Sequence, residues 1–124
     1  MDKWSYSTRL LVLACYLAAL FYFALRPNSG SGDGYTLHFI AFLVLMLLMA
    51  FVGLRLFTAA AICLGIGVAI EFIQLSIPSR SFSGWDMAAD AAGIVTAIAM
   101  LIVWKEVSHE RQCAHPRKRR GHVR

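Results

Sequence analysis

The chain has 124 residues, of which 59% are hydrophobic and 15% are charged, and its mean hydropathy is +0.63. A soluble domain carries about 25% charged residues, so this composition excludes an ordinary soluble domain and indicates an integral membrane protein. The net charge is +5, but seven of the twelve lysines and arginines lie at or after Lys105. The basic character therefore belongs to the C-terminal tail. Its PRKRR segment resembles a nuclear signal, but membrane spans argue against that interpretation, and we expect no nucleic-acid partner.

The first apolar segment predicts a membrane helix over residues 8–25, close to the length of about 20 residues that spanning requires. A basic start before an apolar run also resembles a secretory signal, and residues 12–15 faintly resemble a lipoprotein cleavage site. However, the apolar run continues well past Cys15, and further apolar segments follow it. We therefore favour a retained first helix.

Three more apolar segments predict three more membrane helices. Pro27 ends the first helix and Pro78 the third, because proline cannot continue the helical hydrogen bonds. Glycine and serine predict a surface loop over residues 29–34. The remaining helices are expected over residues 37–54, 56–77 and 86–104. We thus predict an all-α membrane protein whose residues 1–104 form four transmembrane helices in an up-down bundle, followed by a poorly ordered basic tail over residues 105–124.

The lysines and arginines predict the orientation of this bundle. Ten of them fall on one side of a four-helix topology, and they are Lys3, Arg9, Arg55 and the seven of the tail. Only Arg26 and Arg80 fall on the other side. Because basic residues accumulate in cytoplasmic segments, we expect both termini to be cytoplasmic and the loops before His38 and around Arg80 to face outward.

Polar residues concentrate between Glu71 and Gly93, where two apolar segments are joined. A carboxylate at the centre of a membrane helix costs about 2.5–3.5 kcal/mol on insertion scales, and such groups commonly serve function. At about 100° per residue, Glu71 shares a helix face with Gln74, and Asp86 shares one with Asp90. The helix ends then bring the candidate functional residues together near the outer leaflet: His38, Glu71, Gln74, Arg80, Asp86 and Asp90.

Small residues on the predicted helices indicate close helix packing. Gly65 lies in a stripe with Ala61 and Ala69, nearly opposite Glu71, and small residues at this spacing let backbones approach in lipid. The third helix is therefore expected to be the central one. Gly67 lies one turn below Glu71, and Gly93 continues the face that carries Asp90.

Each polar candidate also has an ordinary structural interpretation. Asp86 follows Ser83 at capping-box spacing, so it can serve the helix N-terminus. Gln74 can form a hydrogen bond between helices, and His38 can be an interfacial polar residue. Arg80 can anchor to headgroups or pair with Glu71 or Asp90. These alternatives stay open.

The charges of the predicted cluster constrain its ligand. The outward side carries more acidic than basic groups, which suits a cationic group or a divalent metal better than a phosphate. Histidine and carboxylates can ligate a metal, but no compact motif such as HExxH is present. We expect no cofactor, and a divalent metal remains an alternative. Cys15, Cys63 and Cys113 predict no disulfide framework.

Four motifs resemble those of the VanZ-like family of small bacterial membrane proteins, and the resemblance covers roughly residues 33–102. The motifs are His38-Phe39, Glu71-x-x-Gln74, Pro78-x-Arg80-Ser81-Phe82 and Asp86-x-x-x-Asp90-x-x-Gly93. The family usually has an Asp-Lys pair before the His-Phe, whereas here Asp33 is displaced by one residue and Gly34-Tyr35 replaces the lysine. Asp90 stands where many members have asparagine. The resemblance implies a multi-pass protein of the bacterial cell (inner) membrane, linked to glycopeptide (teicoplanin-type) resistance.

Two classes of function follow. The favoured one is a non-enzymatic envelope protein that contacts membrane lipid and binds an envelope lipid or cell-wall component at the outer leaflet. The alternative is a small membrane enzyme that uses Glu71 and Asp90 as acid and base on a lipid-linked substrate. A proton-coupled transporter would require an oligomer, because four helices barely enclose a pathway.

Overall fold

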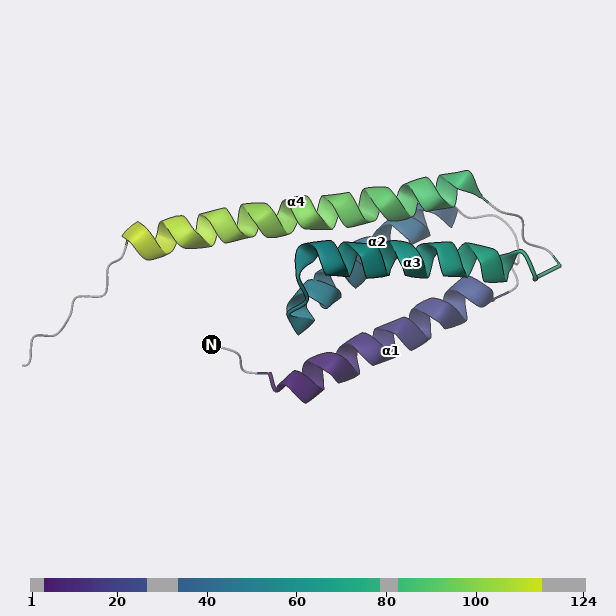
Figure 1. Ribbon diagram of the computed structural model, residues 1–124, viewed down its shortest axis with the longest axis horizontal. Helices are drawn as coiled ribbons and strands as arrows, with labels where there is room; N and C mark the ends of the chain where they lie inside the picture. Colours follow the sequence, from purple (N-terminus) through teal and green to yellow (C-terminus); the bar gives the residue numbers. More distant parts are fainter. Residues whose placement is uncertain (1–3, 27–33, 79–82, 115–124) are drawn as a thin grey trace, which may run out of the picture.

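Four helices make up the computed structural model of the chain, which describes residues 4–26, 34–78 and 83–114 (Figure 1). They are α1 (Tyr6–Leu25), α2 (Gly34–Val52), α3 (Leu56–Gln74) and α4 (Gly84–Ala114). At 1.5 Å per residue, helices of 19 or 20 residues are about 30 Å long, which matches the hydrocarbon core of a bilayer. Each of the four is long and apolar enough to span a membrane. The prediction of an all-α protein with four helices of membrane-spanning length is confirmed.

Successive helices run in opposite directions in Figure 1. As a result, the end of α1, the start of α2, the end of α3 and the start of α4 lie at one end of the molecule, which we call the polar end. The opposite end holds the tight connection between α2 and α3. There the amide of Gly53 donates to the carbonyl of Ala50 at 2.9 Å, and Gly53 has a φ of 102°, which glycine adopts without a steric penalty.

The central helix is α2, and not α3 as the sequence suggested. The core contains one residue of α1, four of α2, three of α3 and two of α4. Its buried apolar residues are Leu13, Phe42, Leu45, Met46, Met49, Ala59, Cys63, Ile70, Ile94 and Ala97. The expectation failed because the stripe around Gly65 faces outward, where a Cβ would meet nothing within 4 Å. The central helix is the one with large buried side chains, and not the one with a stripe of small residues.

Gly93 marks the closest approach of α2 and α4. A Cβ on Gly93 would lie 2.4 Å from the carbonyl oxygen of Phe39 and 3.0 Å from the amide nitrogen of Leu43. Both atoms belong to the α2 backbone, which cannot move aside as a flexible side chain can. The glycine therefore allows the two backbones to approach closely and brings the N-terminal parts of α2 and α4 within hydrogen-bonding distance of one another.

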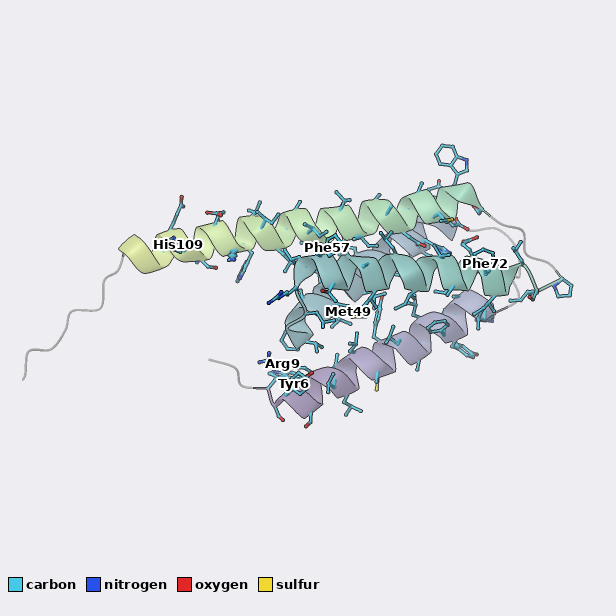
Figure 2. All side chains as sticks on the ribbon, in the orientation of Figure 1. Tyr6, Arg9, Met49, Phe57, Phe72 and His109 are labelled. Atoms are coloured by element: carbon cyan, nitrogen blue, oxygen red, sulfur yellow. The ribbon has the colours of Figure 1, made fainter. Side chains whose placement is uncertain are left out.

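Polar contacts attach α1 to α2. The hydroxyl of Tyr16 donates to the carbonyl of Ala41 at 2.7 Å. Near the end opposite the polar end, the guanidinium of Arg9 lies 5.0 Å from the centre of the Phe51 ring and donates to the Phe51 carbonyl at 3.3 Å (Figure 2). A cation over an aromatic face is attractive, so this contact holds the start of α1 against the end of α2.

Several helix ends differ from their predicted positions: α1 begins two residues earlier, α2 begins three and ends two residues earlier, and α4 begins two residues earlier. The C-terminal ends of α3 and α4 differ as well. The helix α3 ends at Gln74, and tighter hydrogen bonds continue the turn, from Ser76 to Ile73 and from Ile77 to Gln74, both at 3.0 Å. The helix α4 continues ten residues past Trp104, beyond the other helices in Figure 1. Residues 105–114 contain neither glycine nor proline, so nothing in them stops a helix once it leaves the apolar span.

Candidate functional site

The polar end collects most of the predicted functional residues. His38 comes from the second turn of α2, and Glu71 and Gln74 come from the last turn of α3. Asp86 and Asp90 come from the first two turns of α4. Three of these side chains are almost fully buried, with exposed fractions of 1% for Glu71, 1% for Gln74 and 3% for Asp90. Arg80 lies outside the described residues.

His38 and Asp90 form the central pair of the site. The Nδ1 atom of His38 lies 2.9 Å from Oδ1 of Asp90, which is a good hydrogen bond between α2 and α4. The imidazole also stacks on the ring of Phe42, with 6.5 Å between centroids and an angle of 8°. A carboxylate that accepts from Nδ1–H fixes the orientation of the ring and leaves the lone pair of Nε2 available.

Asp86 faces the other ring nitrogen of His38. Its Oδ2 atom lies 3.9 Å from Nε2, which is too long for a hydrogen bond but close enough for both atoms to contact one ligand. The capping role proposed for Asp86 is partly present, since its backbone amide donates to Oγ of Ser83 at 3.3 Å. Its carboxylate is turned toward His38.

Glu71 completes the capping arrangement in place of Asp86. In a capping box, the acidic side chain three residues after the cap accepts from the amide of the cap residue. Here the amide of Ser83 donates to Oε2 of Glu71 at 3.2 Å. Glu71 thereby ties the end of α3 to the start of α4, and the carboxylate of Asp86 is left free to face the site.

Two buried carboxylate oxygens of the site have no hydrogen-bond partner among the described residues. They are Oε1 of Glu71 and Oδ2 of Asp90. A buried acceptor without a partner costs roughly 1–3 kcal/mol, and more when it is charged. One ligand atom from each of His38, Glu71 and Asp86 also lies within 4.8 Å of the other two. The arrangement therefore places several hydrogen-bond acceptors close to one another.

Gln74 serves the scaffold rather than the cluster. Its Nε2 donates to the carbonyl of Ala24 at 2.7 Å. That carbonyl lies in the last turn of α1, where backbone acceptors lack partners within the helix. The hydrogen bond matches the structural interpretation of Gln74, because it fastens α1 to α3 at the polar end.

The depth of the site follows from two exposed tryptophans on α4. Trp85 is 80% exposed and Trp104 is 76% exposed. They are 19 residues apart, or about 28 Å along a helix, which is close to the thickness of the hydrocarbon core. Tryptophans favour membrane interfaces. Asp90 lies five residues, or about 8 Å, inside the Trp85 end, so the cluster sits just below one interface.

Two contacts within the site were not predicted from the sequence. The backbone amide of Ser83 binds Glu71, and the ring of Phe42 supports His38. Phe42 could have been found, because it follows His38 by four residues and such pairs meet on a helix. The contact from Ser83 to Glu71 could not, since it depends on the path of the chain between α3 and α4.

Gly67 shapes the floor of the site. A Cβ at this position would lie 2.9 Å from Oδ2 of Asp90 and 3.4 Å from the ring of Phe42. The absence of a side chain on Gly67 therefore makes room for both the carboxylate and the ring. A larger residue would force the Asp90 carboxylate to shift.

Comparisons of the chain with protein-family models, with curated proteins and with solved structures found no significant match. The resemblance to the VanZ-like family remains a prediction from the motifs.

Proposed function

We propose that this multi-pass membrane protein binds the polar headgroup of an envelope lipid or lipid-linked cell-wall component at the polar end of the bundle. Oε1 of Glu71 and Oδ2 of Asp90, which lack a hydrogen-bond partner within residues 4–26, 34–78 and 83–114, carry this proposal. They are buried in a protein whose helices face lipid, close to one interface. Such groups are expensive and are kept where they serve function, and a bound headgroup would supply the missing donors.

The charge of the site limits the kinds of headgroup that it can bind. Glu71, Asp86 and Asp90 carry three formal negative charges when ionised, and His38 adds at most one positive charge. The described cluster therefore repels a phosphate and attracts groups that donate hydrogen bonds. Sugar hydroxyls and ammonium groups have this chemistry. His38 and Asp86, with side chains 13% and 19% exposed, form the accessible side through which the headgroup would enter.

The orientation proposed from the basic residues places the polar end outside. In the predicted topology, ten of the twelve lysines and arginines fall on the opposite side of the membrane. With both termini in the cytoplasm, the cluster opens to the outer leaflet of the bacterial cell membrane, where lipid-linked cell-wall components are exposed. The VanZ-like motifs add an expected link to teicoplanin-type resistance, which is a family analogy.

Binding of labelled envelope lipids to the purified full-length protein in nanodiscs tests this function. Wild type should retain a labelled lipid, whereas His38→Gln should lose the retention because it removes the group that Asp90 orients. His109→Gln is the matched control, since His109 lies at the opposite end of α4 (Figure 2). Equal retention by wild type and His38→Gln, or no retention by wild type, would contradict the proposal.

One observation favours the alternative of an enzyme. A histidine whose Nδ1 is bound to a buried carboxylate is arranged as a general base, with Nε2 directed at the reacting group. In this form of the alternative, His38 rather than a carboxylate is the base, Asp90 orients it, and Glu71 is the acid. The same nanodisc assay distinguishes the two functions, because an enzyme converts the labelled lipid and a binding protein returns it unchanged.

A further inference from the structure

We infer that His38, Glu71 and Asp86 form a binding site for one divalent transition-metal cation, Zn²⁺ or Mn²⁺. One ligand atom of each residue lies within 4.8 Å of the other two. The three residues come from α2, α3 and α4, so the cation would join three helices at the polar end. This inference does not depend on a lipid ligand.

The distances fit a cation after a small movement. A metal with bonds of about 2.1 Å holds tetrahedral ligands about 3.4 Å apart. Nε2 of His38 and Oδ2 of Asp86 are 3.9 Å apart. Even a separation of 4.8 Å closes to this geometry when each ligand atom moves inward by less than about 1 Å, which side-chain rotation supplies.

The remaining polar atoms already hold the ligands in place. Oδ1 of Asp90 lies 2.9 Å from Nδ1 of His38 and engages that nitrogen, so Nε2 is the atom left for a metal. A carboxylate behind a ligating histidine is the usual supporting group in metal sites. The amide of Ser83 binds Oε2 of Glu71 at 3.2 Å and leaves Oε1 for the metal. Glu71 is 1% exposed, and this Oε1 is unpartnered among the described residues.

The ligand set selects the class of cation. One imidazole and two carboxylates suit zinc, manganese or iron, whereas Ca²⁺ prefers oxygen ligands alone. Two ligating carboxylates balance the charge of a divalent ion. Three protein ligands leave at least one coordination position open, which is the pattern of sites where a metal contacts a substrate or water. The partly exposed side of His38 and Asp86 provides the entrance.

Direct metal binding tests the inference. The full-length protein, with its purification tag removed, is stripped with EDTA in detergent micelles and titrated calorimetrically with Zn²⁺ or Mn²⁺ alone. We expect one ion per chain. His38→Gln, Glu71→Gln and Asp86→Asn should each weaken binding by more than about 100-fold, and Asp90→Asn by about 10–100-fold because it removes only the supporting carboxylate.

His109→Gln controls for a histidine outside the site and should bind as wild type does. Absence of binding by wild type, or undiminished binding by the three ligand variants, would overturn the inference. X-ray absorption of the zinc-loaded wild type requires no variant to fold. One imidazole and only nitrogen or oxygen ligands at about 2.0–2.2 Å would support the site. A sulfur ligand at about 2.3 Å would assign the ion to a cysteine and overturn the inference.

Lipid binding measured with EDTA present separates this inference from the proposed function. A protein that binds lipid but no metal contradicts only the metal site. A protein that binds metal but no lipid contradicts only the headgroup proposal.

Discussion

Replacement of Glu71 by glutamine separates a ligand-binding carboxylate from a structural one. Glutamine keeps the length of the side chain, and its amide oxygen can still accept from the amide of Ser83, which now lies 3.2 Å from Oε2. A hydrogen bond to a charged group contributes about 1.5–3 kcal/mol and a neutral one about 0.5–1.5 kcal/mol. We therefore expect Glu71→Gln to lower the free energy of unfolding by only about 1 kcal/mol.

Two further variants bracket this result. Glu71→Leu leaves the Ser83 amide without its acceptor and should cost about 1–3 kcal/mol. Glu71→Asp is one methylene shorter, so it withdraws the carboxylate from both Ser83 and the cluster. Unfolding by sodium dodecyl sulfate in detergent micelles measures these differences. Glu71→Gln should be folded, abundant and unable to bind the ligand of the site.

A structural ion pair would give the opposite pattern. Removal of one partner from a buried pair costs about 3–5 kcal/mol. If Glu71→Gln loses that much stability, and the double variant with Arg80→Gln partly recovers it, Glu71 is a charge partner of Arg80. Retention of ligand binding by a stable Glu71→Gln protein would equally refute the reasoning.

Three other expectations concern the scaffold and its orientation. Gly93→Ala should lower the free energy of unfolding by about 1–3 kcal/mol, because the added methyl group overpacks α2 against α4. Gly65→Ala places its methyl group in open space and should leave the free energy of unfolding unchanged or slightly raised. Equal effects of the two variants would contradict this expectation. Gln74→Leu should cost about 1 kcal/mol of unfolding free energy and leave metal binding intact, so a loss of binding would place Gln74 in the site. Reporter fusions at the C-terminus and in the 29–34 loop should report opposite compartments, and matching compartments would disprove the orientation.

The number and type of helices could be predicted from the sequence because each span is a long apolar run. The positions of Glu71 and Gln74 on the buried face of α3 also followed, since helical spacing alone decides which residues share a face. Likewise, the predicted face that carries Asp90 and Gly93 is a side of α4 that is buried. These features depend only on local geometry.

The choice of central helix could not be predicted in this way. Small residues occur in α3 and α4, and the spacing that makes Gly93 a contact point also describes Gly65. Only the three-dimensional packing shows that the first touches α2 and the second faces outward. In a membrane protein both lipid-facing and core-facing residues are apolar, so hydrophobicity does not separate the two surfaces as it does in a soluble protein.

The different roles of the cluster residues could also be recognised only from the structure. The sequence grouped Gln74 with Glu71, but their side chains serve different neighbours, since Gln74 binds α1 and Glu71 binds the start of α4. The pairing of His38 with Asp90 joins residues 52 positions apart. Spacing within one helix carries no information about which residue of another helix lies opposite.

Native mass spectrometry of the protein extracted gently from its own membrane tests the central claim most directly. The account predicts that wild type carries a lipid adduct whose mass includes an amine- or sugar-bearing headgroup. The stable Glu71→Gln protein should lack that adduct, while Gly65→Ala should retain it. The same adduct on Glu71→Gln, or its absence from wild type, would contradict a headgroup site at the polar end.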